Sequence, residues 1–93
     1  MLFHYVYVLE SALDAKRYIG YTHNLKRRLE EHESGKSFAT KSRRPFKLVY
    51  FEGCLHSEDA KRRERYLKTT QGLRFLGLRL KEHKHAQALG AGR

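Results

Sequence analysis

The first residues of the chain alternate in the manner of a β-strand. Across residues 2–9, one side carries Tyr5, Tyr7 and Leu9, and the other carries Val6 and Val8. A period of two is typical of a half-buried strand. Residues 17–21 form a second strand after a polar loop, so we expect a hairpin. Gly20 marks a place in it where backbone or a ligand comes close.

A helical period follows the hairpin. Its inward stripe, at spacing i, i+3, i+4, i+7, consists of Leu25, Arg28, Leu29 and His32. An arginine and a histidine therefore share a face with two leucines. We expect Thr22 or Asn24 to cap a helix over residues 25–34, and Gly35 to end it.

The next apolar segment is short and follows a basic loop. Residues 46–51 predict a third strand that ends at Glu52-Gly53. Ser57 is the expected cap of a second helix, which runs to about Thr69. The core-facing stripe of this helix consists of Ala60, Glu64 and Leu67, which places a carboxylate between two apolar side chains.

The C-terminal part predicts one more helix. Gln71-Gly72 indicates a break, and residues 73–84 a third helix with Leu73, Leu76 and Leu80 on one side, before an aperiodic end. We therefore predict an α+β fold, with a small three-stranded antiparallel sheet flanked by three helices in the order β-β-α-β-α-α. The domain covers residues 1–82, and a basic, frayed tail covers 83–93.

The net charge of the chain indicates which class of molecule it binds. Twenty Lys and Arg face ten Asp and Glu, and the net charge of +10 predicts a polyanion, most commonly nucleic acid. No apolar run approaches the ~20 residues of a membrane span, and we expect no signal peptide because the first residues lack a basic leader. A single cysteine, Cys54, excludes an intrachain disulfide and suits a cytoplasmic setting.

Basic side chains are spread over several segments of the chain. We expect phosphate contacts from Lys36, Lys41, Arg43, Arg44, Arg62 and Arg63. The alternative is a surface charge that serves solubility alone.

Each candidate for chemistry has a structural alternative. Glu64 is an inward acid, which either pairs with a nearby arginine or binds a metal, and Mg²⁺ can be held by one carboxylate plus waters and substrate phosphate. Arg28 either extends to solvent or grips a phosphate. His32 is either a core histidine or a phosphate or proton partner. Tyr7 and Tyr18 are either ordinary strand aromatics or phenols whose pKa is lowered by nearby cations. Tyr5 and Tyr21 are further candidates, and the local pattern does not rank the four.

The order of these residues resembles the GIY-YIG nuclease family, over about residues 2–82. Tyr5-Val6-Tyr7 stands where the family has Gly-Ile-Tyr, and Tyr18-Ile19-Gly20 matches the second motif in full. Residues 22–32 are similar to the family's first helix, and residues 60–64 to its second. More narrowly, the chain is similar to small single-domain bacterial members. These are related to the catalytic domain of structure-specific nucleases that cut branched DNA.

The resemblance implies a Mg²⁺- or Mn²⁺-dependent DNA endonuclease that prefers branched or distorted DNA. It implies that Tyr18 is the general base, that Tyr7 positions the nucleophile, that Arg28 stabilises the charge in transit and that Glu64 holds the metal. His32 would support the phosphate or the proton transfer. A partner protein would supply substrate specificity, since the chain has no separate DNA-binding domain.

Two positions depart from the family pattern. Tyr5 replaces a glycine, and no asparagine follows Glu64, because Asn24 is the only one in the chain. The second departure keeps an alternative open: a non-catalytic nucleic-acid-binding module of the same fold, acting in DNA repair or with RNA or the ribosome.

Overall fold

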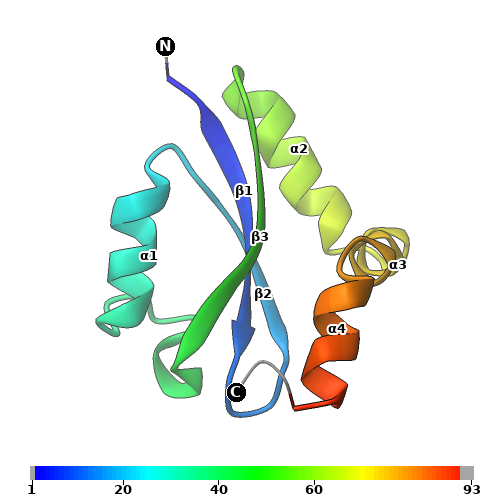
Figure 1. Cartoon of the computed structure of the whole chain (residues 1–93). Helices are drawn as coiled ribbons and strands as arrows, with labels where there is room; N and C mark the ends of the chain where they lie inside the picture. The colour runs from blue at the N-terminus through cyan, green and yellow to red at the C-terminus, as the bar shows by residue number, and fades with distance from the viewer. Residues whose placement is uncertain (1, 91–93) are drawn as a thin grey trace.

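The computed structural model describes residues 2–90. The elements, coloured along the chain in Figure 1, are β1 (His4–Ser11), β2 (Arg17–Thr22), α1 (Leu25–Glu33), a 3-10 turn (Lys41–Arg43), β3 (Phe46–Cys54), α2 (Ser57–Leu67), α3 (Thr70–Arg79) and α4 (Lys81–Ala88). The predicted α+β class and three-stranded antiparallel sheet are confirmed, with four helices where the sequence predicted three.

β1 is the central strand of the sheet, in the order β2-β1-β3. In the two antiparallel registers, Tyr7 lies opposite Gly20 on one side and opposite Phe51 on the other. A bulge between Val8 and Leu9 shifts the pairing with β3. Because side chains alternate along a strand, β1 sends Val6 and Val8 to one face of the sheet and Tyr7 and Leu9 to the other, as the sequence predicts.

The two faces of the sheet have different roles. α2 and α3 cover one face, where the core consists of Val6, Val8, Ile19, Ala60, Leu67 and Leu76. α1 lies across the other face, as Figure 1 shows, and there the buried side chains include the polar Tyr7 and His32. Apolar packing therefore stabilises the fold from one side and leaves the other side available for polar chemistry.

α1 is held at both ends by specific contacts. Asn24 is its cap, and the Asn24 side chain accepts from the Arg27 backbone N–H at 3.1 Å. Gly35 follows the helix with a φ of +82°, a left-handed conformation that glycine adopts without strain. The Arg44 side chain lies over Gly35 and donates to the Glu33 carbonyl at 3.1 Å. These contacts fix the direction in which α1 presents its side chains.

Several predicted boundaries were wrong. β3 continues through Gly53 to Cys54, because it pairs with β1 along that whole length. α2 has His56 at its cap position with no side-chain cap hydrogen bond, so Ser57 lies inside the first turn. The break predicted at Gln71-Gly72 lies instead at Lys68-Thr69.

The C-terminal region differs most from the prediction. The Thr69 side chain caps α3 by accepting from the Gly72 N–H at 3.1 Å, so the helix starts earlier than the sequence suggests. The buried stripe is Gly72, Leu76 and Leu80, and Leu73 is half exposed. Leu80 separates α3 from α4, so residues 83–88 are helical and not a frayed tail. Residues 91–93 lie outside the described part of the chain.

Within residues 2–90, no helix combines the length and apolarity needed to cross a bilayer.

Two glycines of α3 give a matched pair for testing this packing. A Cβ on Gly72 would meet the Tyr66 carbonyl and the Leu67 Cα, which are rigid backbone atoms, whereas a Cβ on Gly77 would meet nothing within 4 Å. Gly72→Ala should lower the free energy of unfolding by about 3 kcal/mol. Gly77→Ala should raise it by about 0.5–1 kcal/mol, since alanine favours an exposed helix interior. Urea unfolding monitored by circular dichroism measures both, and equal effects of the two variants would refute the close approach of α2 and α3.

Candidate active site

The hydroxyl of Tyr7 is the centre of a buried polar network. Tyr7 is completely buried, and its hydroxyl lies 2.8 Å from His32 Nε2 and 3.2 Å from Arg28 Nε. Tyr7 comes from the central strand, and its two partners come from α1. The inward stripe predicted for α1 is therefore confirmed, because Arg28 and His32 turn toward the sheet with the helix leucines.

Gly20 makes room for the Tyr7 phenol. A Cβ at position 20 would clash with the Tyr7 hydroxyl and would lie 2.5 Å from its Cζ. Gly20 is the direct cross-strand partner of Tyr7, so the ring lies across the bare backbone of β2. The close approach predicted for Gly20 is therefore an approach of a neighbouring side chain.

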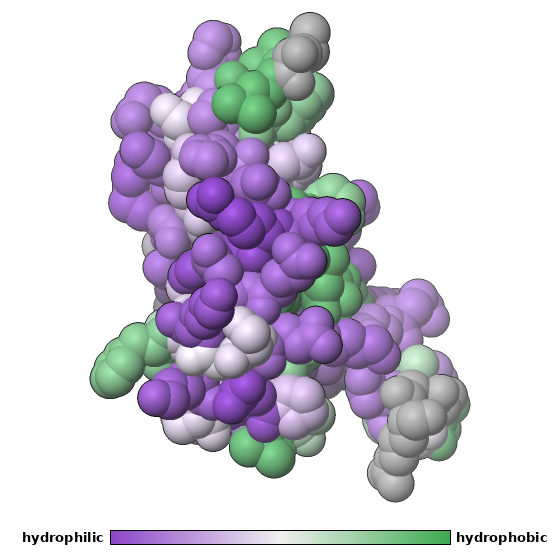
Figure 2. Space-filling model, turned by 90° about the vertical axis from the view of Figure 1, so that its left-hand side faces the viewer, coloured by the Kyte–Doolittle hydropathy of each residue, from purple (hydrophilic) through white to green (hydrophobic). Residues whose placement is uncertain are grey.

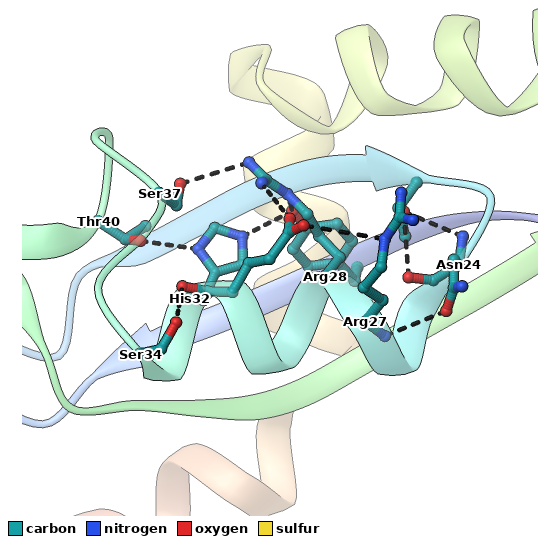
Figure 3. Close-up of polar contacts among 10 residues, drawn as sticks. Asn24, Arg27, Arg28, His32, Ser34, Ser37 and Thr40 are labelled. Carbon is teal, nitrogen blue, oxygen red and sulfur yellow. Dashed lines mark hydrogen bonds and ion pairs between the residues drawn. The ribbon is translucent and has the colours of Figure 1, made fainter.

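The loop between α1 and β3 completes the network. His32 Nδ1 lies 2.7 Å from the hydroxyl of Thr40, and Arg28 Nη2 donates to the Ser37 hydroxyl at 3.3 Å. Figure 3 shows Arg28 and His32 pointing from α1 toward these two loop residues. Ser37 and Thr40 are both buried, so the loop after α1 is part of the site.

The contacts favour one placement of the protons. The Tyr7 oxygen accepts from Arg28 Nε, and the buried hydroxyl needs an acceptor for its own proton, so we expect that proton to be donated to His32 Nε2. His32 then carries its proton on Nδ1 and donates to Thr40. Burial, and after it the charge of Arg28, lowers the pKa of His32 below its ordinary value, which favours this neutral ring.

The same surroundings keep Tyr7 protonated. Burial raises the pKa of Tyr7 to about 12, an effect that exceeds the opposing influence of the hydrogen bond from Arg28. A phenol in this state holds its neighbours in place and does not accept a proton at neutral pH.

Tyr18 lies beside the network but is less enclosed. Its ring centre is 5.2 Å from that of His32 and 6.3 Å from that of Tyr7. Tyr18 is half-buried, in β2 at the edge of the sheet. Of the two tyrosines predicted for the site, Tyr18 is the less buried.

Arg28 has a partner at every nitrogen of its guanidinium. Nη1 bonds Glu31 Oε1 at 2.9 Å, in addition to the contacts of Nε with Tyr7 and of Nη2 with Ser37. The bond to Glu31, together with the smaller influence of Tyr7 and Tyr18, raises the pKa of Arg28. The same bond lowers the pKa of Glu31. Arg28 is thus a fixed cation whose side chain is still 31% exposed.

Three members of the network were missed by the sequence analysis: Glu31, Ser37 and Thr40. Glu31 is three residues after Arg28 on the same helix, and that spacing is a usable signal. Ser37 and Thr40 offer none, because their place depends on how the loop folds back over α1.

Glu64 lies apart from the network. It is on α2, which packs on the opposite face of the sheet, and its carboxylate pairs with Lys68 at 2.9 Å. Within residues 2–90, no hydrogen bond or ion pair joins Glu64 to Tyr7, Arg28 or His32, and no three His, Cys, Asp or Glu residues form a metal-binding group. Metal binding by Glu64 therefore stays a prediction. The contact joins residues i and i+4 of one helix and Lys68 is exposed, so it is worth only about 0.3–0.5 kcal/mol and is easily exchanged.

The predicted phosphate contacts divide into two groups. Four of the arginines have partners within the chain. Arg43 pairs with Asp14 and lies over the Phe46 ring, and Arg44 donates to a carbonyl at the end of α1. Arg62 pairs with Asp59, and Arg63 pairs with Glu52. Lys36 and Lys41 are exposed, and among the described residues they form no ion pair with an acid. These two lysines flank the loop that carries Ser37 and Thr40, so they are the better placed for phosphate.

Comparison with known proteins gives a consistent result. The GIY-YIG catalytic domain matches residues 3–75. A UPF0213 protein of Oceanobacillus iheyensis is 38% identical over 85 residues, which cover 90% of this chain and 95% of that protein. The solution NMR structure of a UPF0213 protein from Bacillus halodurans superposes with a TM-score of 0.51 and 37% identity, over 81% of this chain and 82% of that one.

Some relatives match over less of their length. UPF0213 proteins of Streptococcus pneumoniae and Syntrophus aciditrophicus are 46% and 56% identical over 65 and 50 residues, and the chain spans 65% and 56% of those two proteins. The domain match over residues 3–75 includes both tyrosines, α1 and α2. Together with the relative that is similar along nearly its whole length, it shows that this chain belongs to the GIY-YIG catalytic domain family, a family of nucleases.

Proposed function

We propose that this protein is a Mg²⁺-dependent DNA endonuclease that hydrolyses phosphodiester bonds, with a preference for branched or distorted DNA. The observation that carries the proposal is the Tyr7 network, in which one buried phenol joins a fixed arginine and a neutral histidine. A guanidinium held in this way is suited to stabilising the charge that develops on phosphate.

The pKa of Tyr7 supports a division of roles between the two tyrosines. Tyr7 stays protonated and orients Arg28 and His32, and Tyr18, as a phenolate, would accept the proton of the attacking water and become a phenol. His32 supports the phosphate or the transfer of the proton. Arg28 faces the phosphate by sharing or exchanging its contact with Glu31.

The residues of the chain are compatible with a water-rich Mg²⁺ site. Glu64 would be the protein ligand, and waters and the substrate phosphate would complete the coordination. When bound, the metal would supply Lewis-acid stabilisation of the phosphate. The half-buried Glu64 would be free for this role once its weak contact with Lys68 was broken.

One alternative function has a specific observation in its favour. Glu64 pairs with Lys68 and the chain lacks an asparagine after it, which suits a nucleic-acid-binding module without catalysis. A module of that kind would bind branched DNA tightly and give no product in Mg²⁺ or Mn²⁺, whereas the proposed nuclease gives product in either metal and none in EDTA.

Replacing the metal acid tests the mechanism. Glu64→Gln should lower the cleavage rate by on the order of 10³-fold or more, because metal stabilisation is worth several kcal/mol. DNA binding in EDTA should stay the same or tighten, since a negative charge is removed. Glu58→Gln is the matched control, because Glu58 is an exposed acid of the same helix that pairs with Lys61. Full metal-dependent cleavage by Glu64→Gln would contradict the mechanism.

Arg28→Lys keeps the positive charge and removes the planar fork. It should bind DNA nearly normally and cleave it about two to three powers of ten more slowly, the usual loss for one such donor. Arg27→Lys is the control on the adjacent, more exposed position. Single-turnover cleavage of labelled branched DNA measures both rates. If the two variants cleave equally fast, Arg28 does not act on the reacting phosphate.

The salt dependence of binding tests the basic loop. Wild-type affinity should fall as salt rises, and the double variant Lys36→Ala, Lys41→Ala should flatten the slope of log affinity against log salt by about 2, at ~0.9 for each lost contact with duplex DNA. Fluorescence anisotropy in EDTA gives the slopes. A slope that does not change would remove both lysines from the DNA interface.

A further inference from the structure

Aromatic side chains lie uncovered on the same face of the sheet as the Tyr7 network. Phe3 directly precedes β1, Tyr5 lies at its start, and Phe51 comes from β3, where it is the direct partner of Tyr7. Phe3 is 39% exposed and Phe51 is 51% exposed, while Tyr5 is half-buried between them. α1 covers the remainder of this face and leaves this end of the sheet open.

The rings form one continuous row. The ring centres of Phe3 and Tyr5 are 6.4 Å apart, and those of Tyr5 and Phe51 are 6.1 Å apart. Gly53 lets the Phe3 and Tyr5 rings lie close to the backbone of β3, because a Cβ there would meet both rings at 3.2 Å. Tyr5 stands where the family motif has glycine, and it supplies the central ring of the row.

Two exposed cations follow in the chain soon after the strand that pairs with Tyr5. Thr22 of β2 pairs with Tyr5, and the chain passes from Thr22 within three residues into α1, where Lys26 and Arg27 are exposed. Figure 2 shows apolar side chains gathered at the end of the molecule where β1 begins, beside a hydrophilic face over α1. An anion with flat apolar faces would match this combination of charge and rings.

We propose that Phe3, Tyr5 and Phe51 are a stacking surface for unpaired bases of the substrate, next to the Tyr7 network. The inference rests on the proposed function, because it takes nucleic acid as the substrate. Base pairs in a duplex are stacked at ~3.4 Å along each strand and hide their faces. Rings more than 6 Å apart suit bases that have separated from one another. The substrate is therefore DNA with unpaired nucleotides beside the phosphate that is cut.

Other occupants fit the surface less well. A second copy of the chain would bring two proteins of charge +10 together, and this repulsion opposes association. A rigid sheet end carrying three rings also lacks the long apolar face of a helix that lies on a membrane. Both alternatives have outcomes in the test below.

The chain has no tryptophan, so Phe51→Trp introduces a single fluorescent reporter. Its emission in EDTA should be quenched by a short oligothymidylate and by a duplex with a single-stranded flap, and much less by a blunt duplex. Phe51→Ala should weaken oligothymidylate binding by roughly 5- to 150-fold, the range for loss of one base–aromatic stack. The affinity for the blunt duplex should be unchanged within error.

Two further variants isolate the ring. Phe51→Leu retains an apolar side chain and should be nearly as weak as Phe51→Ala. Leu78→Ala removes an exposed apolar side chain from α3 and should bind like the wild type. Circular dichroism melts confirm that the variants fold. Wild-type binding by Phe51→Leu, or an equal loss for oligothymidylate and duplex, would overturn the proposal.

The remaining outcomes separate this inference from the proposed function. Sedimentation without DNA tests for a dimer, and anionic lipid vesicles test for membrane binding. If Phe51→Ala abolished either kind of association, the surface would bind a second copy or a lipid surface, and the inference would be overturned. An unquenched tryptophan with intact Arg28-dependent cleavage would also overturn it and leave the nuclease function standing. Quenching by oligothymidylate without any cleavage in Mg²⁺ would support the stacking surface and overturn the proposed nuclease function.

Discussion

The fully buried hydroxyl of Tyr7 has to find its hydrogen-bond partners inside the protein. Leaving such a group unsatisfied costs about 1–3 kcal/mol, so the surroundings of Tyr7 are constrained. Gly20 leaves space for the phenol, and α1 is oriented to bring Arg28 and His32 to it. Thr40 then satisfies the second nitrogen of the histidine, which draws the loop after α1 over the site. One buried phenol thereby connects two strands, a helix and a loop.

The residues that stabilise the fold and the residues of the Tyr7 network lie on opposite faces of the sheet. The apolar core lies between the sheet and α2 and α3, so α1 and its loop can carry polar groups without weakening the main packing. Arg28 is held by three different partners before any substrate arrives. A preorganised cation does not have to be reoriented during the reaction, and this is the principal advantage of a fixed electrostatic site. Glu31 keeps the arginine paired, and in the proposed mechanism a phosphate shares or takes its place.

Much of the fold and part of the site could be predicted from the sequence. The alternation in β1 placed Tyr7 on the correct face, and the stripe of α1 placed Arg28 and His32 on one side, because both patterns follow from local geometry. The start of α3 could not be predicted, because Gly72 is a point of close helix contact and not a break. The division at Leu80 carries no glycine or proline signal. Ser37 and Thr40 were missed because their roles depend on tertiary folding, and Arg44 was interpreted as a phosphate ligand although it closes the end of α1.

The central claim is that Tyr7 donates its proton to a neutral His32 and so fixes the site with Tyr7 protonated. Long-range ¹H–¹⁵N NMR of labelled protein reports the tautomer and the pKa of His32 directly. The account predicts a proton on Nδ1, a bare Nε2 and a pKa below the ordinary value of about 6.5. A proton on Nε2 at neutral pH, or a pKa above that value, would reverse the direction of the Tyr7–His32 hydrogen bond and contradict the account.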